Sequence, residues 1–219
     1  MKHEAKLERF LIGLRGLGLL REWPFGDPER ANEQLEAIAD LLARRDEPPM
    51  NEALDLEELD QEAGYAAWAP TYDGPDPMIE VEEAALRPIL GGFEAGEAVD
   101  VACGTDRLAV MLCELGHRVV GVDPSEAMLE QARAKDIPAT FRSGSFDRLP
   151  IADDSTDLVT CALALTHTRD LEGPMREFAR VLRRGGHAVV SDVHPIATAT
   201  GAQALFERAD GSRGVLTNH

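Results

Sequence analysis

Two features of the sequence point first to chemistry: a turn of small residues, and an acidic residue nineteen positions after the glycine of that turn. The predicted strand Ala98–Ala102 leads into Cys103 and Gly104, and the next predicted strand is followed by Asp123. A glycine at such a turn lets the backbone approach a ligand closely, and the N–H groups of a following helix attract a carboxylate or a phosphate. A carboxylate at the end of the next strand can accept hydrogen bonds from the hydroxyls of a ribose. The pair predicts a site for a ribose-containing ligand.

Two histidines are candidates for acid–base chemistry. His167 and His194 each follow a later apolar run, so both are expected at the edge where parallel strands end. An imidazole titrates near neutral pH and can act as a general base. The alternative is that each is an exposed or structural histidine. No metal site is expected, because the scattered histidines and acidic residues lack the spacing of a ligand cluster.

An aromatic cluster lies earlier in the chain. Tyr65, Trp68 and Tyr72 fall within eight residues and include both tyrosines of the sequence. Aromatic faces stabilise a cation, so the cluster could cover a positively charged ligand as a lid. It could equally anchor its own segment through its largest apolar side chains.

The elements that would position these residues alternate between short apolar runs and helical patterns. Strands separated by helices imply right-handed crossovers, and nearly continuous apolar strands imply a sheet covered on both faces. The predicted fold class is α/β, a doubly wound parallel sheet of about five strands with helices on both faces. Ligands of such sheets bind at the carboxyl ends of the strands. The expected strands are 98–102, 118–122, 139–142, 157–163 and 187–193, and the expected helices are 79–90, 105–115, 125–135 and 170–182.

An N-terminal extension precedes this core. Two amphipathic helices are expected to form a hairpin over residues 4–45, the second with Asp27 as its N-cap and Pro28 at its first position. Eight acidic residues and no basic one follow in 46–62, which favours a solvated linker over an acidic interaction segment. The predicted domains are therefore residues 1–62, the helical hairpin and linker, and residues 63–219, the α/β domain.

The C-terminal end of the sequence is short for a further crossover. Only 26 residues follow Val193; they predict a helix over 202–208, a turn, and one short piece over 214–217. The fifth strand is then expected to be an apolar edge, which the helical hairpin or a second copy of the chain could cover.

The composition excludes some classes of partner. The 219 residues contain 40 Asp and Glu against 22 Lys and Arg, a formal charge of −18. Neither a nucleic acid nor an anionic membrane is expected as a partner, because binding phosphates requires a basic surface. Three widely spaced cysteines favour a reducing, cytoplasmic location, and no secretory or membrane segment is expected.

Three motifs in order resemble the class I S-adenosylmethionine-dependent methyltransferases. VDVACGTDRLAVMLCELGHRVVGVDPSEAMLEQAR resembles the first half of that domain, FRSGSFDRLPIADDSTDLVTCALALTH its adenine-side and fourth-strand segments, and REFARVLRRGGHAVVSDVHP its fifth-strand segment. More loosely, YAAWAPTYDG resembles the segment that closes over the cofactor. The resemblance covers about residues 95–195 and implies a Rossmann-like fold with S-adenosylmethionine as the cofactor.

The resemblance also implies roles for single residues. Asp123 would hold the ribose hydroxyls, Ser145 and Phe146 would meet the adenine, and Ala162 with the residues after it would line the methyl-donor side. The implied cofactor-binding residues are Tyr65, Trp68, Tyr72, Asp100, Ala102, Cys103, Gly104, Asp106, Asp123, Pro124, Ser145, Phe146 and Ala162, with Ser125 beside them.

Asp106 separates the functional alternatives. Its carboxylate would repel the pyrophosphate of a dinucleotide, whereas S-adenosylmethionine carries no phosphate. The family usually has glycine at this position, so Asp106 is also a departure that is expected to weaken cofactor binding. The favoured function is transfer of a methyl group to a small-molecule acceptor. The alternative is an inactive or merely cofactor-binding relative that acts as a partner protein.

Overall fold

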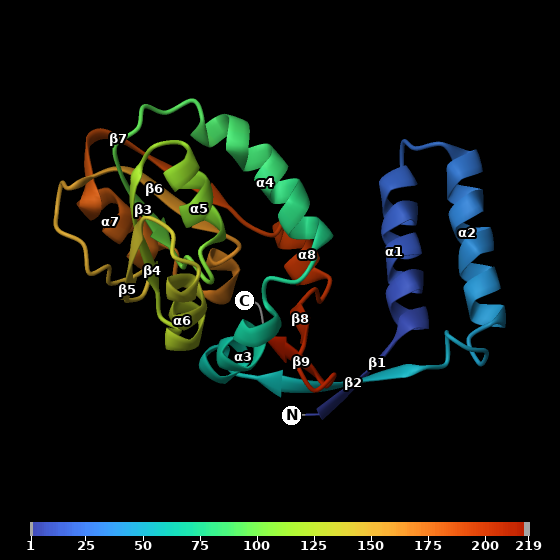
Figure 1. The fold of residues 1–219 in the computed structure, drawn as a ribbon. Coiled ribbons are helices and arrows are strands. Elements are labelled where there is room, and N and C mark those ends of the chain that lie inside the picture. Colours follow the sequence, from blue (N-terminus) through green and yellow to red (C-terminus); the bar gives the residue numbers. More distant parts are fainter. Residues whose placement is uncertain (1, 217–219) are drawn as a thin grey trace. The chain divides into compact units, whose positions relative to one another are not determined.

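The computed structural model describes residues 2–216 (Figure 1). The chain divides into two compact units, Met1–Glu58 and Leu59–His219.

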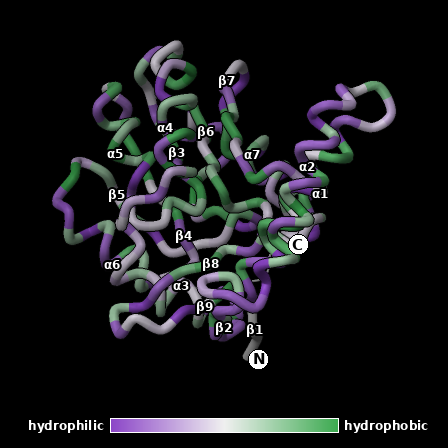
Figure 2. Tube along the Cα trace, turned by 90° about the vertical axis from the view of Figure 1, so that its right-hand side faces the viewer, coloured by the Kyte–Doolittle hydropathy of each residue, from purple (hydrophilic) through white to green (hydrophobic). Residues whose placement is uncertain are grey.

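The N-terminal unit is a pair of helices with a pair of strands at its base. Asp27 caps the second helix as expected, because its side chain accepts a hydrogen bond of 2.9 Å from the N–H of Glu29. The acidic stretch expected to be a linker contains a strand instead, paired antiparallel with the first strand of the chain. Both hydrophobic and hydrophilic stretches run along the two helices (Figure 2). The elements are β1 (Lys2–Lys6), α1 (Leu7–Glu22), α2 (Pro28–Ala43) and β2 (Ala53–Leu59).

The C-terminal unit is built on a five-stranded sheet in the order β5-β4-β3-β6-β7, in which every neighbouring pair is parallel. The predicted α/β class and strand number are confirmed, and β7 lies at one edge of this sheet. The strands are β3 (Glu97–Val101), β4 (Arg118–Asp123), β5 (Ala139–Ser143), β6 (Thr156–Ala162) and β7 (Leu182–Ser191).

Helices cover both faces of the sheet. On one face, Phe178 and Val181 of α7 pack in a cluster with Val99 and Val159. On the other face, side chains of α4 and α5 pack in a second cluster against alternate positions of the same strands. The helices of the unit are α3 (Gln61–Trp68), η1 (Ala69–Thr71), α4 (Pro77–Leu90), α5 (Arg107–Glu114), α6 (Glu126–Ala134), η2 (Leu165–His167), α7 (Glu172–Val181) and α8 (Pro195–Ala199).

The helix predicted over 202–208 is wrong. The chain forms β8 (Ala204–Glu207) there, which pairs antiparallel with β9 (Arg213–Leu216) across a turn at Gly211. The physical reason is contact outside the segment: the buried Phe206 ring stacks on Trp68 with centroids 5.0 Å apart. Residue 217 of the short piece expected over 214–217 lies outside the described residues.

Candidate functional site

A cavity of about 250 Å³ opens where β3, β4 and β6 end. Nine residues singled out in the sequence contribute to its lining, together with Ser125: Tyr65, Tyr72, Ala102, Gly104, Asp123, Pro124, Phe146, Ala162 and His167. The carboxyl ends of neighbouring parallel strands meet at one edge, which is why residues so far apart in sequence converge.

Asp123 is a buried carboxyl group in the wall of this cavity. It ends β4, is 6% exposed, and accepts hydrogen bonds from the N–H groups of Gly104 at 2.9 Å and Ser125 at 2.8 Å. Burial raises its pKa, while these two N–H groups act in the opposite direction. Each carboxylate oxygen retains a lone pair beyond the one used by the backbone. The geometry suits an acceptor of two further hydrogen bonds, such as those from a diol.

The turn after β3 keeps a backbone shape that normally requires glycine. Ala102, Gly104 and Asp106 all have positive φ, at 54°, 56° and 99°. A non-glycine residue in this region costs about 1–2 kcal/mol, less for aspartate than for most types. Two of the three positions therefore hold the turn's conformation without the residue that adopts it most easily.

Two expected cofactor residues, one at the end of β3 and one in this turn, lie in the core rather than in the cavity lining. Asp100 is 2% exposed and accepts a 2.7 Å hydrogen bond from the hydroxyl of Thr160. Burial raises the pKa of Asp100 to about 7 against the opposing effect of that hydrogen bond. Cys103 is buried as well, and burial raises the pKa of its thiol.

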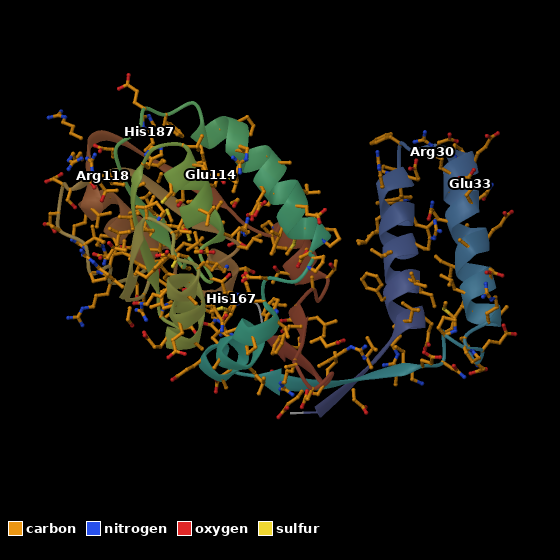
Figure 3. All side chains as sticks on the ribbon, in the orientation of Figure 1. Arg30, Glu33, Glu114, Arg118, His167 and His187 are labelled. Atoms are coloured by element: carbon orange, nitrogen blue, oxygen red, sulfur yellow. The ribbon has the colours of Figure 1, made fainter. Side chains whose placement is uncertain are left out.

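His167 meets the aromatic segment. Its Nε2 lies 2.7 Å from the hydroxyl oxygen of Tyr65, and Gln61 donates to its carbonyl oxygen at 2.8 Å. Figure 3 shows His167 next to α3, which carries Tyr65. The N–H of Thr166 donates to Asp192 at 2.7 Å, which ties this turn to the end of β7. The structure thus brings a candidate base and an aromatic hydroxyl together in one cavity wall.

Trp68 packs against both tyrosines of the cavity wall. It stacks on Tyr65 with ring centroids 6.0 Å apart and on Phe206 on its other side. Tyr72 lies against Trp68 at 4.8 Å. Within residues 2–216, Trp68 is not part of the cavity lining, so it positions the two tyrosines.

Ser145, His194 and Asp106 likewise lie outside this lining, as far as the structure describes the chain. Ser145 donates to the carboxylate of Asp147 at 2.5 Å. His194 is exposed and caps α8, its Nδ1 accepting from the N–H of Ile196 at 3.2 Å. Asp106 points to a second cavity and pairs with Lys135. Of the two candidate bases, the structure places only His167 at the cavity.

Three lining residues were not anticipated from sequence. Glu62 and Gln61 come from the start of α3, which the acidic content of this stretch concealed. Met128 lies in the first turns of α6 and is 1% exposed, a position that helical periodicity alone assigns to the core. The unanticipated residues are Gln61, Glu62 and Met128, whereas Leu163 and Ala164 directly follow Ala162 and were expected beside it.

Comparisons with known proteins indicate the family of this domain. Residues 99–190 match the family model described as "Methyltransferase domain". A crystal structure of an S-adenosylmethionine-dependent methyltransferase from Mesorhizobium loti is 35% identical, covers 61% of this chain and 63% of that one, and superposes with a TM-score of 0.50.

Residues 99–190 form a class I S-adenosylmethionine-dependent methyltransferase domain. The family resemblance expected from sequence is confirmed, and the cofactor that this family implies is S-adenosylmethionine.

Curated relatives of this methyltransferase domain act on different compounds. A demethylmenaquinone methyltransferase from Chlorobaculum parvum is 33% identical over 132 residues, 56% of this chain and 55% of that protein. A malonyl-(acyl-carrier protein) O-methyltransferase from Yersinia pestis is 29% identical over 171 residues, 77% of this chain and 61% of that protein. The chain therefore spans little more than half the length of these relatives. Within residues 2–216, no helix combines the length and apolar character needed to cross a bilayer.

Proposed function

We propose that this methyltransferase transfers a methyl group from S-adenosylmethionine to a small-molecule acceptor. The observation that carries the proposal is one cavity, at the carboxyl ends of the strands, that contains both the Asp123 carboxylate and the Tyr65–His167 pair.

The residues present fit the cofactor. Asp123 would accept hydrogen bonds from the ribose, and Phe146 and Met128 offer apolar contact for the adenine. The faces of Tyr65 and Tyr72 suit a positive charge. When bound, S-adenosylmethionine supplies a methyl group on a positively charged sulfur, which becomes a neutral thioether once the acceptor has taken that methyl group.

The Tyr65–His167 pair would remove the acceptor's proton. Burial raises the pKa of Tyr65 above its ordinary value, so its hydroxyl stays protonated. With the ring proton of His167 on Nδ1, this hydroxyl would donate to Nε2. An acceptor hydroxyl would pass its proton to the oxygen of Tyr65 while the proton of Tyr65 moves to His167. The products of this step are a neutral tyrosine and an imidazolium, and the acceptor oxygen is left as the nucleophile.

The names of the relatives suggest which acceptors to test. Relatives are named for a demethylmenaquinone and for a malonyl group on a carrier protein. Transfer of labelled methyl groups to a demethylmenaquinone, a malonyl thioester and a simple catechol would distinguish a quinol-type acceptor from a carboxylate. No transfer to any of them, together with no binding of S-adenosylmethionine at millimolar concentration, would refute the proposal.

Single substitutions test the proposed base. His167→Gln is expected to lower kcat roughly 100-fold or more, the usual contribution of a general base, with cofactor affinity unchanged. Tyr65→Phe is expected to lower kcat as well. His187→Gln is the matched control, because His187 is exposed and lies away from His167 (Figure 3). Equal losses in the His167 and His187 variants would contradict the assignment.

A cofactor-binding protein without transfer activity is the second candidate. Asp106, at a position where the family usually has glycine, favours it. Calorimetric binding of S-adenosylmethionine without turnover of any acceptor would support this candidate over the first.

A further inference from the structure

Asp106, the residue that departs from the glycine pattern, belongs to an ion-pair cluster beside the candidate cofactor cavity. Its side chain is 2% exposed, and its Oδ1 lies 2.7 Å from Nζ of Lys135, which directly follows α6. Lys135 also donates to the carbonyl oxygen of Thr105 at 2.7 Å. Although burial lowers the pKa of Lys135, hydrogen bonds with Asp106 and Asp73 raise it overall, so the ammonium stays charged at neutral pH.

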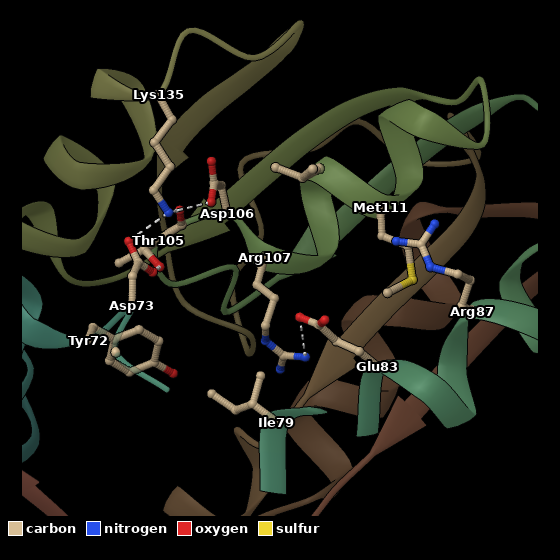
Figure 4. A pocket seen from close by; sticks show the side chains of 12 residues that line it. Tyr72, Asp73, Ile79, Glu83, Arg87, Thr105, Asp106, Arg107, Met111 and Lys135 are labelled. Carbon is tan, nitrogen blue, oxygen red and sulfur yellow. Dashed lines mark hydrogen bonds and ion pairs between the residues drawn. The ribbon is translucent and has the colours of Figure 1, made fainter. Parts of the chain in front are cut away.

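The same ammonium reaches the segment between η1 and α4. Nζ of Lys135 lies 2.8 Å from Oδ2 of Asp73, and the other oxygen of Asp73 accepts from the hydroxyl of Thr105 at 2.5 Å. Figure 4 shows Lys135 and Thr105 converging on Asp73, with the ring of Tyr72 beside it. These contacts fasten the residue after Tyr72 to the glycine turn.

Tyr72 stands between two cavities. It lines the cavity of about 250 Å³ that contains Asp123, and it lines a second cavity of about 480 Å³ that contains Asp106 and Lys135. A Cβ placed on Gly104 would lie 3.8 Å from Cε1 and 4.0 Å from the hydroxyl oxygen of Tyr72. The ring therefore lies over the glycine turn and separates the two spaces.

The first cavity is small for a whole cofactor. Sites for ligands of this size enclose roughly 300–1,000 Å³, whereas the space next to Asp123 is about 250 Å³. Movement of Tyr72 would join it to the second cavity across the turn.

We propose that Asp106, Lys135 and Asp73 form a latch that holds Tyr72 across the glycine turn and so controls the entry and release of S-adenosylmethionine. The inference rests on the proposed function. It also gives Asp106 a role, because its buried carboxylate fixes the ammonium to which Asp73 fastens.

The exposure of the cluster indicates which link opens. The side chain of Asp73 is 51% exposed and that of Lys135 is 35% exposed, so water can replace their contact. Exposed ion pairs contribute little to stability and break readily, whereas separating the buried Asp106 carboxylate from its partner is costly. The latch therefore opens where Asp73 leaves Lys135 and the hydroxyl of Thr105, and it stays closed between Lys135 and Asp106.

The test measures the kinetics of cofactor binding by stopped-flow fluorescence, with S-adenosylmethionine and its demethylated product. Asp73→Ala removes the opening link and leaves the buried pair intact. Its association and dissociation rate constants are both expected to rise at least fivefold, while Kd changes less than threefold. Lys135→Met should act in the same direction. Arg133→Met is the matched control, because Arg133 lies near the end of α6, two residues before Lys135, and forms an ion pair with the exposed Glu126. Rate constants equal to the wild type, or a rise in dissociation alone, would overturn the latch.

A second measurement separates this inference from the proposed function. Hydrogen exchange of the amides in 71–76, recorded without any ligand, is expected to be at least fivefold faster in Asp73→Ala than in the wild type or in Arg133→Met. If the wild type binds neither ligand, the proposed function fails and this exchange comparison alone decides the latch. Equal exchange in all three proteins would overturn it.

Discussion

The buried carboxyl of Asp100 makes the stability of the C-terminal unit depend on pH. Its pKa is raised from 3.8 to about 7, mainly because burial disfavours the charged form. The folded state therefore holds this proton more tightly than the unfolded chain does. Stability contributed by the group is present at low pH and is lost as pH rises from about 4 to about 7.

The size of the effect follows from the two pKa values. One pKa unit corresponds to about 1.36 kcal/mol. Between pH 5 and about pH 7, the unfolded chain has released this proton while the folded state retains it. The free energy of unfolding therefore falls by about two pKa units, or about 2–3 kcal/mol, between pH 5 and pH 8. Asn cannot ionise, so Asp100→Asn should gain about 2–3 kcal/mol relative to the wild type over the same interval.

The assay is urea unfolding of both proteins at pH 5 and pH 8. Trp23→Phe serves as the background, because Trp68 then reports on the C-terminal unit alone. Asp136→Asn is the control, since Asp136 is exposed. If the difference between Asp100→Asn and the background is the same at both pH values within about 0.5 kcal/mol, the reasoning about Asp100 is refuted.

Three further substitutions test other parts of the structure. Asp123→Asn places an amide where two backbone N–H groups donate, and calorimetry should show cofactor affinity reduced about 10- to 100-fold, with Asp147→Asn unchanged. Gly64→Ala places a Cβ 2.1 Å from Cδ2 of the buried Leu216, so thermal unfolding should show a loss of about 1–3 kcal/mol in the C-terminal unit despite the better helix propensity of alanine. Gly13→Ala, where a Cβ meets nothing within 4 Å, should instead stabilise α1 by about 1 kcal/mol, measured by circular dichroism; a loss there would mean that the space is filled in solution.

The core of the fold could be predicted from sequence because its signals are local. The apolar runs, the helices between them and the glycine stops each lie within a few residues, and the parallel order follows from the connections. The carboxyl ends of β3 and β4 therefore brought Gly104 and Asp123 together as expected.

The parts that could not be predicted depend on distant contacts. The segment around Phe206 is rich in helix-forming residues, and only its pairing with β9 and its stacking on Trp68 make it a strand. In β2, the alternation of Leu54 and Leu56 is present, but the surrounding acidic residues favoured a linker. Tyr65 and His167 were both singled out, yet their contact joins residues 102 positions apart, which no local pattern encodes.

The glycine turn has a consequence for how relatives of this chain are recognised. The glycines in a family's sequence pattern mark positions where the backbone adopts a positive φ. Here Ala102 and Asp106 adopt positive φ values of 54° and 99°, although neither residue is a glycine. A search that scored positions by their ability to adopt left-handed angles, rather than by identity with glycine, would recover chains of this kind that a literal motif passes over.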